Sequence, residues 1–78
     1  MKTTPYFRFM KTRTDRSFIK DEWIQHVIDN PIYREVQEDE RIRLWSKVPE
    51  MSDRYLSVIL LKDNETVHNA FFDRNFRQ

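Results

Sequence analysis

The first part of the chain shows an alternation with a period of two. Residues 5–12, PYFRFMKT, alternate aromatic with basic side chains. This pattern is typical of an edge strand, with Phe7 and Phe9 on one face and Tyr6 and Arg8 on the other. We therefore expect the domain to begin with a strand.

The pattern then changes to the period of a helix. Residues 18–31 carry apolar side chains three and four positions apart, acidic residues near the start, and Asn30-Pro31 at the end. These features predict one amphipathic helix over residues 18–31. Its apolar stripe consists of Ile19, Trp23, Ile24, Val27 and Ile28.

Two strands follow, over residues 32–37 and 41–48. A three-residue loop at Glu38–Glu40 gives chemically matched neighbours, whereas a two-residue loop does not, so we expect the first register. The predicted pairs are Val36 with Ile42, Glu35 with Arg43, and Tyr33 with Trp45.

The last two predicted strands are residues 55–61, which are apolar on both faces, and residues 65–76. Asp63-Asn64 suits a two-residue turn because Asn tolerates a positive φ. Such a turn pairs Leu60 with Val67, Ile59 with His68 and so on along the hairpin. The more apolar face would then pack on the helix, and it consists of Leu56, Val58, Leu60, Val67, Asn69 and Phe71.

These elements predict one α+β domain over residues 1–78, in the order β-α-β-β-β-β, with a single helix on a small, mostly antiparallel sheet. A chain of 78 residues buries only about two-thirds of its surface, so its core is small. It has no cysteine, so neither disulfides nor a thiolate zinc site can stabilise it.

Composition excludes several classes of function. The net charge is only +1, no apolar run approaches 18 residues, and glycine is absent. We therefore expect a cytoplasmic protein that does not cross a membrane and has no Walker or Rossmann phosphate loop. Two distant histidines without cysteine give no recognised metal spacing, so we expect neither a metal nor a cofactor.

Candidate functional side chains concentrate near the end of the chain, in ETVHNAFFDRNF, residues 65–76. His68 titrates near neutrality and is a candidate acid or base, although a half-buried structural histidine is the simpler alternative. Asn69 is expected to face the core and to hold backbone in place. Asp73 and Arg74 form a structural ion pair, with each other or with another element, or belong to a site.

Basic and aromatic side chains also share faces of the predicted strands. Arg41, Arg43 and Trp45 alternate on one strand, and Tyr6 and Arg8 share a face of the first. Guanidinium groups suit phosphate and aromatic rings suit stacked bases, but Glu35 can also neutralise Arg43 on an ordinary solvated face.

The pattern NP…REVQ…RIR.W…YL.V…ETVHNAFFDR.F runs through most of the chain. It resembles small, uncharacterised bacterial proteins, many of them cyanobacterial, that are similar to RelE/ParE-like toxins of the barnase–colicin–RelE nuclease group. The likeness covers roughly residues 3 to 77. It implies a RelE-like fold and the toxin component of a type II toxin–antitoxin pair.

The resemblance implies an endoribonuclease that cleaves mRNA without a metal, by attack of the ribose 2′-hydroxyl on phosphorus. His68 would then be the acid or base, with Arg43 and Arg74 as catalytic phosphate clamps. The implied RNA contacts are Arg41, Arg8, Tyr6 and Trp45, and the implied structural supports are Asn69 and Asp73.

The implied partners are a cognate antitoxin protein and RNA, including mRNA on the ribosome. A free toxin would also expose the surface that its antitoxin covers, which allows a homodimer. The alternative is a non-catalytic protein-binding module of the same fold, an inactive toxin relative or a regulator. Related sequences often have a histidine in place of Tyr6 and a cation in place of Ser57, and their absence here favours that alternative. Related sequences also usually have glycines in place of Glu40 and Asn64.

Overall fold

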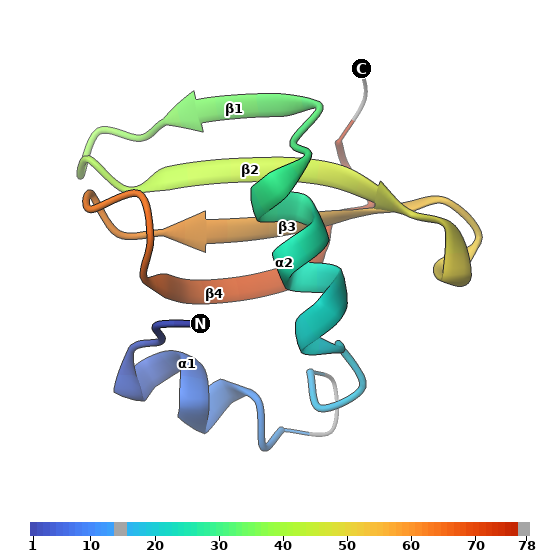
Figure 1. Cartoon of the computed structure of the whole chain (residues 1–78), viewed down its shortest axis with the longest axis horizontal. Helices are drawn as coiled ribbons and strands as arrows, with labels where there is room; N and C mark the ends of the chain where they lie inside the picture. Colours follow the sequence, from blue (N-terminus) through green and yellow to red (C-terminus); the bar gives the residue numbers. More distant parts are fainter. Residues whose placement is uncertain (14–15, 77–78) are drawn as a thin grey trace.

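Two helices precede a four-stranded antiparallel sheet in the computed structural model, which describes residues 1–13 and 16–76 (Figure 1). The strands lie in sequence order, β1-β2-β3-β4. Helix α2 crosses one face of the sheet, and α1 lies beside β4 (Figure 1). The elements are α1 (Pro5–Met10), α2 (Asp21–Asp29), β1 (Tyr33–Val36), β2 (Ile42–Val48), a 3-10 turn (Pro49–Met51), β3 (Arg54–Leu60) and β4 (Val67–Phe72).

The strand predicted over residues 5–12 is wrong, because this segment forms the helix α1. The side-chain hydroxyl of Thr4 accepts a hydrogen bond from the backbone N–H of Phe7 at 3.1 Å, and Pro5 occupies the first turn. A threonine N-cap followed by proline is a strong helix start, and it prevails over the alternation of side chains. The observed order is therefore α-α-β-β-β-β, and the strand-first order that agreed with a RelE-like fold is absent from the described residues.

Helix α2 confirms the predicted apolar stripe but is shorter than predicted. Ile24 and Val27 are fully buried against the sheet, together with Trp23. Ile19 is buried as well, but it precedes the helix, in a turn where its N–H bonds the carbonyl of Arg16. Within residues 1–13 and 16–76, no helix is long and apolar enough to span a membrane.

The register predicted for the first hairpin is confirmed. Tyr33 lies opposite Trp45, Glu35 opposite Arg43, and Val36 opposite Ile42. Within the loop, the N–H of Glu40 bonds the carbonyl of Gln37, and Glu40 adopts a φ of 70°. This left-handed conformation lets three residues close the turn, at a cost for a residue with a Cβ atom.

The register predicted for the second hairpin is correct only at its first pair, Leu60 with Val67. A β-bulge at His68 then shifts the pairing, so that Ile59 lies opposite Asn69. The bulge brings Ala70 to the helix-covered face and places Asn69 on the opposite face, so the prediction that Asn69 enters the core is wrong. A single inserted residue thereby avoids burying an amide, which costs roughly 1–3 kcal/mol when unpaired.

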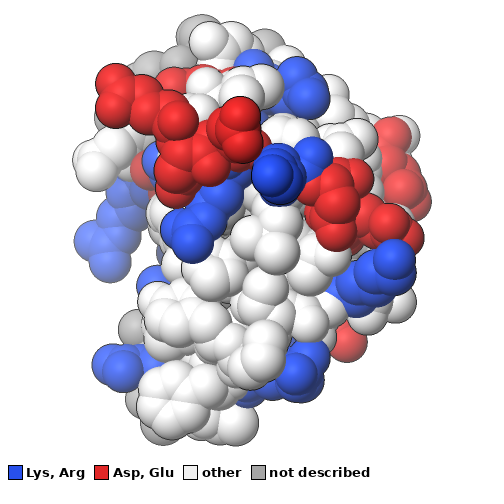
Figure 2. All heavy atoms as spheres, turned by 90° about the vertical axis from the view of Figure 1, so that its left-hand side faces the viewer, with Lys and Arg blue, Asp and Glu red and all other residues white. Residues whose placement is uncertain are grey.

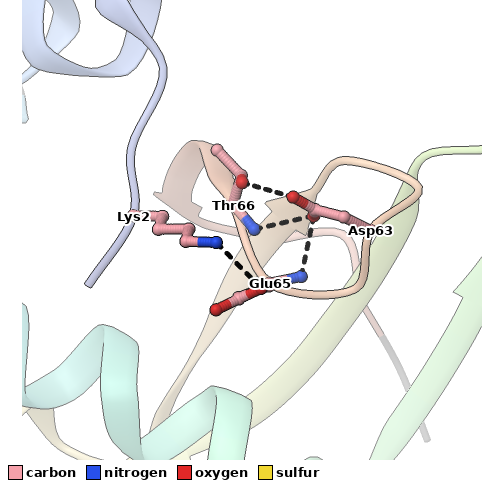
Figure 3. A network of polar contacts seen from close by, with 4 residues as sticks. All are labelled: Lys2, Asp63, Glu65 and Thr66. Carbon is pink, nitrogen blue, oxygen red and sulfur yellow. Dashed lines mark hydrogen bonds and ion pairs between the residues drawn. The ribbon is translucent and has the colours of Figure 1, made fainter.

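The chain before α1 covers the outer edge of β4. The N–H of Thr4 donates to the carbonyl of Val67 at 3.0 Å, and the N–H of Val67 donates to the carbonyl of Lys2 at 2.8 Å. Nearby, Lys2 pairs with Glu65 at 3.3 Å (Figure 3). These bonds fix the start of β4 against the N-terminal segment.

The turn before β4 is ordered by a carboxylate. Asp63 accepts hydrogen bonds from the hydroxyl and N–H of Thr66 and from the N–H of Glu65 (Figure 3). The Thr66 hydroxyl above all, and then these backbone donors, lower the pKa of Asp63. The bulge at His68 therefore follows a turn of defined geometry.

Replacing Glu40 by glycine should stabilise the protein. Glycine removes the Cβ cost of the left-handed conformation, and we expect a gain of about 0.5–1 kcal/mol in the free energy of unfolding. Urea unfolding of E40G measures this gain. The control E38G changes the same loop at a residue without a positive φ and should be neutral or destabilising. Equal destabilisation by both substitutions would contradict the argument.

Candidate functional site

His68 is held in place by the beginning of α1. Its Nδ1 lies 3.1 Å from the hydroxyl oxygen of Thr4, the residue that caps α1. The ring of Tyr6 stacks on the imidazole, with 4.9 Å between centroids and 23° between planes. The resulting His68 site, defined as Thr4, Tyr6, Arg41 and His68, joins the N-terminal helix to the bulge in β4.

The contact with Thr4 links the tautomer of His68 to the role of its other ring nitrogen. If the Thr4 hydroxyl donates to Nδ1, Nε2 carries the proton and can donate it. If Nδ1–H donates to Thr4, Nε2 is an acceptor and can act as a base. In either tautomer, Nε2 makes no hydrogen bond to the residues that the structure describes. The free nitrogen is the one that can meet a substrate.

The charge around His68 favours the neutral imidazole. Partial burial and then the positive charge of Arg41 lower the pKa of His68, while Asp39 acts weakly in the opposite direction. Asp39 also pairs with Arg41 at 3.6 Å. His68 is therefore a neutral group beside a cation, which is the state that a general base needs at neutral pH.

The pKa of His68 should lie below its usual value of about 6.5 and should respond to Arg41. An NMR titration of the imidazole protons should show the pKa rising in R41Q and falling in D39N, since these changes remove opposite charges. Protonation should also destabilise the fold, because the unfolded chain binds the proton more tightly. Stability is thus lost as pH falls from about 6.5 through the pKa of the folded protein. An unchanged pKa in R41Q would contradict the proximity of Arg41.

Arg43 forms a second polar group on the sheet face opposite α2. Its Nε donates to the hydroxyl of Ser57 at 2.8 Å, and its NH2 donates to Oδ2 of Asp73 at 2.8 Å. The indole Nε1 of Trp45 donates to the same oxygen at 3.0 Å. We name these four residues, Arg43, Trp45, Ser57 and Asp73, the Arg43 cluster.

Aromatic rings cover the Arg43 cluster. The guanidinium lies 4.7 Å from the ring centroid of Trp45 and 5.1 Å from that of Phe71. Phe76 stacks on Trp45 with 4.8 Å between centroids. Trp45 is only 4% exposed, so in this conformation it presents no open face to a base. Arg43 and Trp45 therefore act in packing here.

Asp73 is ionised within this cluster. Burial alone would raise the pKa of its carboxyl group, but the indole N–H of Trp45, the backbone N–H of Asn75 and the charge of Arg43 together lower it. The arginine that Asp73 pairs with is Arg43, at 2.8 Å.

Removing the Asp73 carboxylate should destabilise the protein markedly. D73A leaves the N–H groups of Arg43 and Trp45 without their acceptor, and we expect a loss of roughly 2–3 kcal/mol in the free energy of unfolding. The control E65A removes an exposed ion pair with Lys2 and should cost less than about 0.5 kcal/mol. Thermal unfolding measures both.

The same carboxylate predicts a pH dependence. Because the pKa of Asp73 is lower in the folded protein, its contribution is complete above the unfolded value of about 3.9 and is lost as pH falls below it. The acid sensitivity of the wild type should therefore exceed that of D73N. Parallel curves of stability against pH would contradict the assignment.

Of the remaining predicted site residues, Asn69 and Arg8 form hydrogen bonds with residues other than His68. The side-chain Oδ1 of Asn69 accepts a hydrogen bond from Arg16 at 2.8 Å. Arg8 donates to the carbonyl of Thr3 at 2.8 Å, and the exposed Arg74 follows the far end of β4. With about 3.3 Å per residue along a strand, His68 and Arg74 are separated by almost the full length of β4.

The structure thus groups Tyr6 and Arg41 with His68, but it does not group Arg43 and Arg74 with them. Thr4 was missed by the sequence analysis, although the Thr4-Pro5 helix start was visible in the sequence. Among residues 1–13 and 16–76, no three His, Asp or Glu side chains are arranged to hold a metal ion.

The side of the molecule that carries the β1–β2 turn and the turn before β4 is uneven in charge. Figure 2 shows acidic side chains gathered in the upper part of this side of the molecule and a mostly uncharged area below. The acidic turn contains the exposed residues Glu38, Asp39 and Glu40. Exposed apolar side chains of the N-terminal segment are Met1, Tyr6 and Phe9.

Comparison of the chain with protein-family models, with curated proteins and with solved structures finds no match. The class that the structure itself defines is a small α+β domain with two helices and a four-stranded antiparallel sheet.

Proposed function

We propose that this protein is the toxin component of a toxin–antitoxin pair and that it cleaves RNA at the His68 site without a metal. The observation that carries the proposal is a neutral histidine, fixed by Thr4 and Tyr6, with an unbonded Nε2 and a neighbouring arginine. The resemblance of the NP…NAFFDR.F pattern to RelE/ParE-like proteins supports the same function.

The proposed reaction is an internal transfer of the phosphoryl group. Nε2 of His68 takes the proton of the ribose 2′-hydroxyl, whose oxygen forms a bond to phosphorus while the bond from phosphorus to the 5′-oxygen breaks. The imidazolium then supplies the proton to the departing 5′-oxygen, which leaves a 2′,3′-cyclic phosphate. Arg41 offsets the charge on the phosphoryl oxygens, and the half-exposed ring of Tyr6 contacts the base.

Induction of the chain in a bacterial host tests the proposal. The wild type should arrest growth and create new RNA ends, and H68A should lose both effects, because loss of the acid–base group lowers the rate by at least about 100-fold. H26A is the matched control, since His26 lies on α2 and takes no part in the site. Purified protein with EDTA should still produce 2′,3′-cyclic ends.

Two results would overturn the proposed ribonuclease activity of the His68 site. One is a wild type that neither arrests growth nor cleaves RNA, and the other is cleavage that persists in H68A. Circular dichroism must show that H68A is folded, because this variant also loses the contacts with Thr4 and Tyr6.

A non-catalytic binding module is the second candidate, and it is favoured by a different observation. Met1, Tyr6 and Phe9 of the N-terminal segment are exposed, and Figure 2 shows a mostly uncharged area on one side of the molecule. Exposed aromatic side chains are typical of surfaces that bind another protein, here an antitoxin. If the protein is such a binding module, F9D should lose binding to the antitoxin and H68A should keep it.

A further inference from the structure

Two hollows lie where β4 ends, at the opposite end of that strand from His68. Their volumes are about 190 and 390 Å³. Both are lined by Arg54, Phe72 and Arg74, and we name the two hollows together the arginine groove. The second hollow is also lined by Arg16 and Phe71.

Guanidinium groups in the groove are supported by aromatic rings. Arg54 lies 4.8 Å from the ring centroid of Phe72, and Arg16 lies 5.4 Å from that of Phe71. Stacking on a ring fixes the plane of a guanidinium and leaves its N–H edge for an acceptor. In Arg16 that edge already donates to Oδ1 of Asn69 and to the carbonyl of Ala70, so Arg54, and not Arg16, is the candidate donor. No described residue accepts a hydrogen bond from the Arg54 guanidinium.

The lining of the groove contains more basic than acidic side chains. Its lining contains three arginines, Arg16, Arg54 and Arg74, and one acidic residue, Asp73. The Asp73 carboxylate is already bonded to Arg43 and Trp45. The chain as a whole carries only +1, so the cationic character of this site comes from its arrangement in space.

We propose that the arginine groove binds the phosphate and the base of a single-stranded nucleic acid. Planar guanidinium forks suit phosphate oxygens, and aromatic rings beside them suit an unpaired base, since every base has a face that can stack. The proposal rests on the proposed function only in taking that nucleic acid to be RNA.

The groove would hold nucleotides outside the bond that is cleaved. His68 and Phe72 are four residues apart on β4, or about 13 Å at about 3.3 Å per residue. A strand of RNA that follows β4 can therefore occupy the His68 site and the arginine groove together. The groove thus contributes affinity and the His68 site contributes the reaction.

Binding of a 12-nucleotide 2′-O-methyl RNA, measured by fluorescence anisotropy over a range of salt, tests the groove. This probe has no free 2′-hydroxyl and cannot be cleaved, so binding is measured apart from any reaction. R54Q should raise Kd at least fivefold and reduce the salt slope by about 0.7, the value for one lost phosphate contact with a single strand. R54K should keep the salt slope but weaken binding, because it lacks the planar fork.

R34Q is the matched control. Arg34 is an exposed arginine on β1, at the opposite edge of the sheet, and its loss should change Kd by less than twofold. Equal effects of R54Q and R34Q on Kd, or no binding of the probe by the wild type, would overturn the proposal that the groove binds nucleic acid.

The outcomes also separate the groove from the ribonuclease. If the chain does not cleave RNA but R54Q weakens binding of the probe, the proposed binding role of the groove is supported and the proposed ribonuclease activity is overturned. If H68A abolishes cleavage while R54Q binds the probe as R34Q does, the ribonuclease activity is supported and the proposed binding role of the groove is overturned.

Discussion

The packing of the sheet face opposite α2 depends on the hydrogen bonds that the carboxylate of Asp73 accepts. A chain of this length has one helix, α2, to cover one face, and the opposite face needs another cover. Asp73 accepts from Arg43 and Trp45, and it thereby holds a cation and an indole over the strands. Phe71 and Phe76 complete this layer through their contacts with the two side chains. An ion pair takes part in packing here because its donors and acceptor are satisfied within the layer.

The bulge at His68 connects packing with chemistry. Val67 must be buried against the core, and Ala70 must replace Asn69 there, which a regular strand cannot achieve. The inserted residue leaves the ladder and meets Thr4 and Tyr6 instead. The position of the imidazole is therefore a consequence of core packing at the edge of the sheet, and its surroundings lower its pKa.

Local patterns predicted some of these features and missed others for identifiable reasons. Complementary pairs such as Glu35 with Arg43 were enough to choose the first register, because the side chains of one hairpin are neighbours in sequence. The segment 5–12 was misassigned because its alternation outweighed the Thr4-Pro5 helix start. His68 was found by its chemistry, but its contact with Thr4 joins residues 64 positions apart and leaves no local pattern.

The sequence by itself determined the α+β class, the apolar stripe of α2, the first hairpin and the absence of cysteine chemistry, since each depends on residue types and their spacing. Only the tertiary structure decided which arginines are committed to packing and which line a surface. Arg43 and Arg54 are the same residue type on neighbouring strands. One is paired with Asp73 and covered by rings, and the other lies over Phe72 at the edge of a groove. The charge of an arginine is set by its chemistry, but its availability depends on acceptors and rings that come from distant parts of the chain.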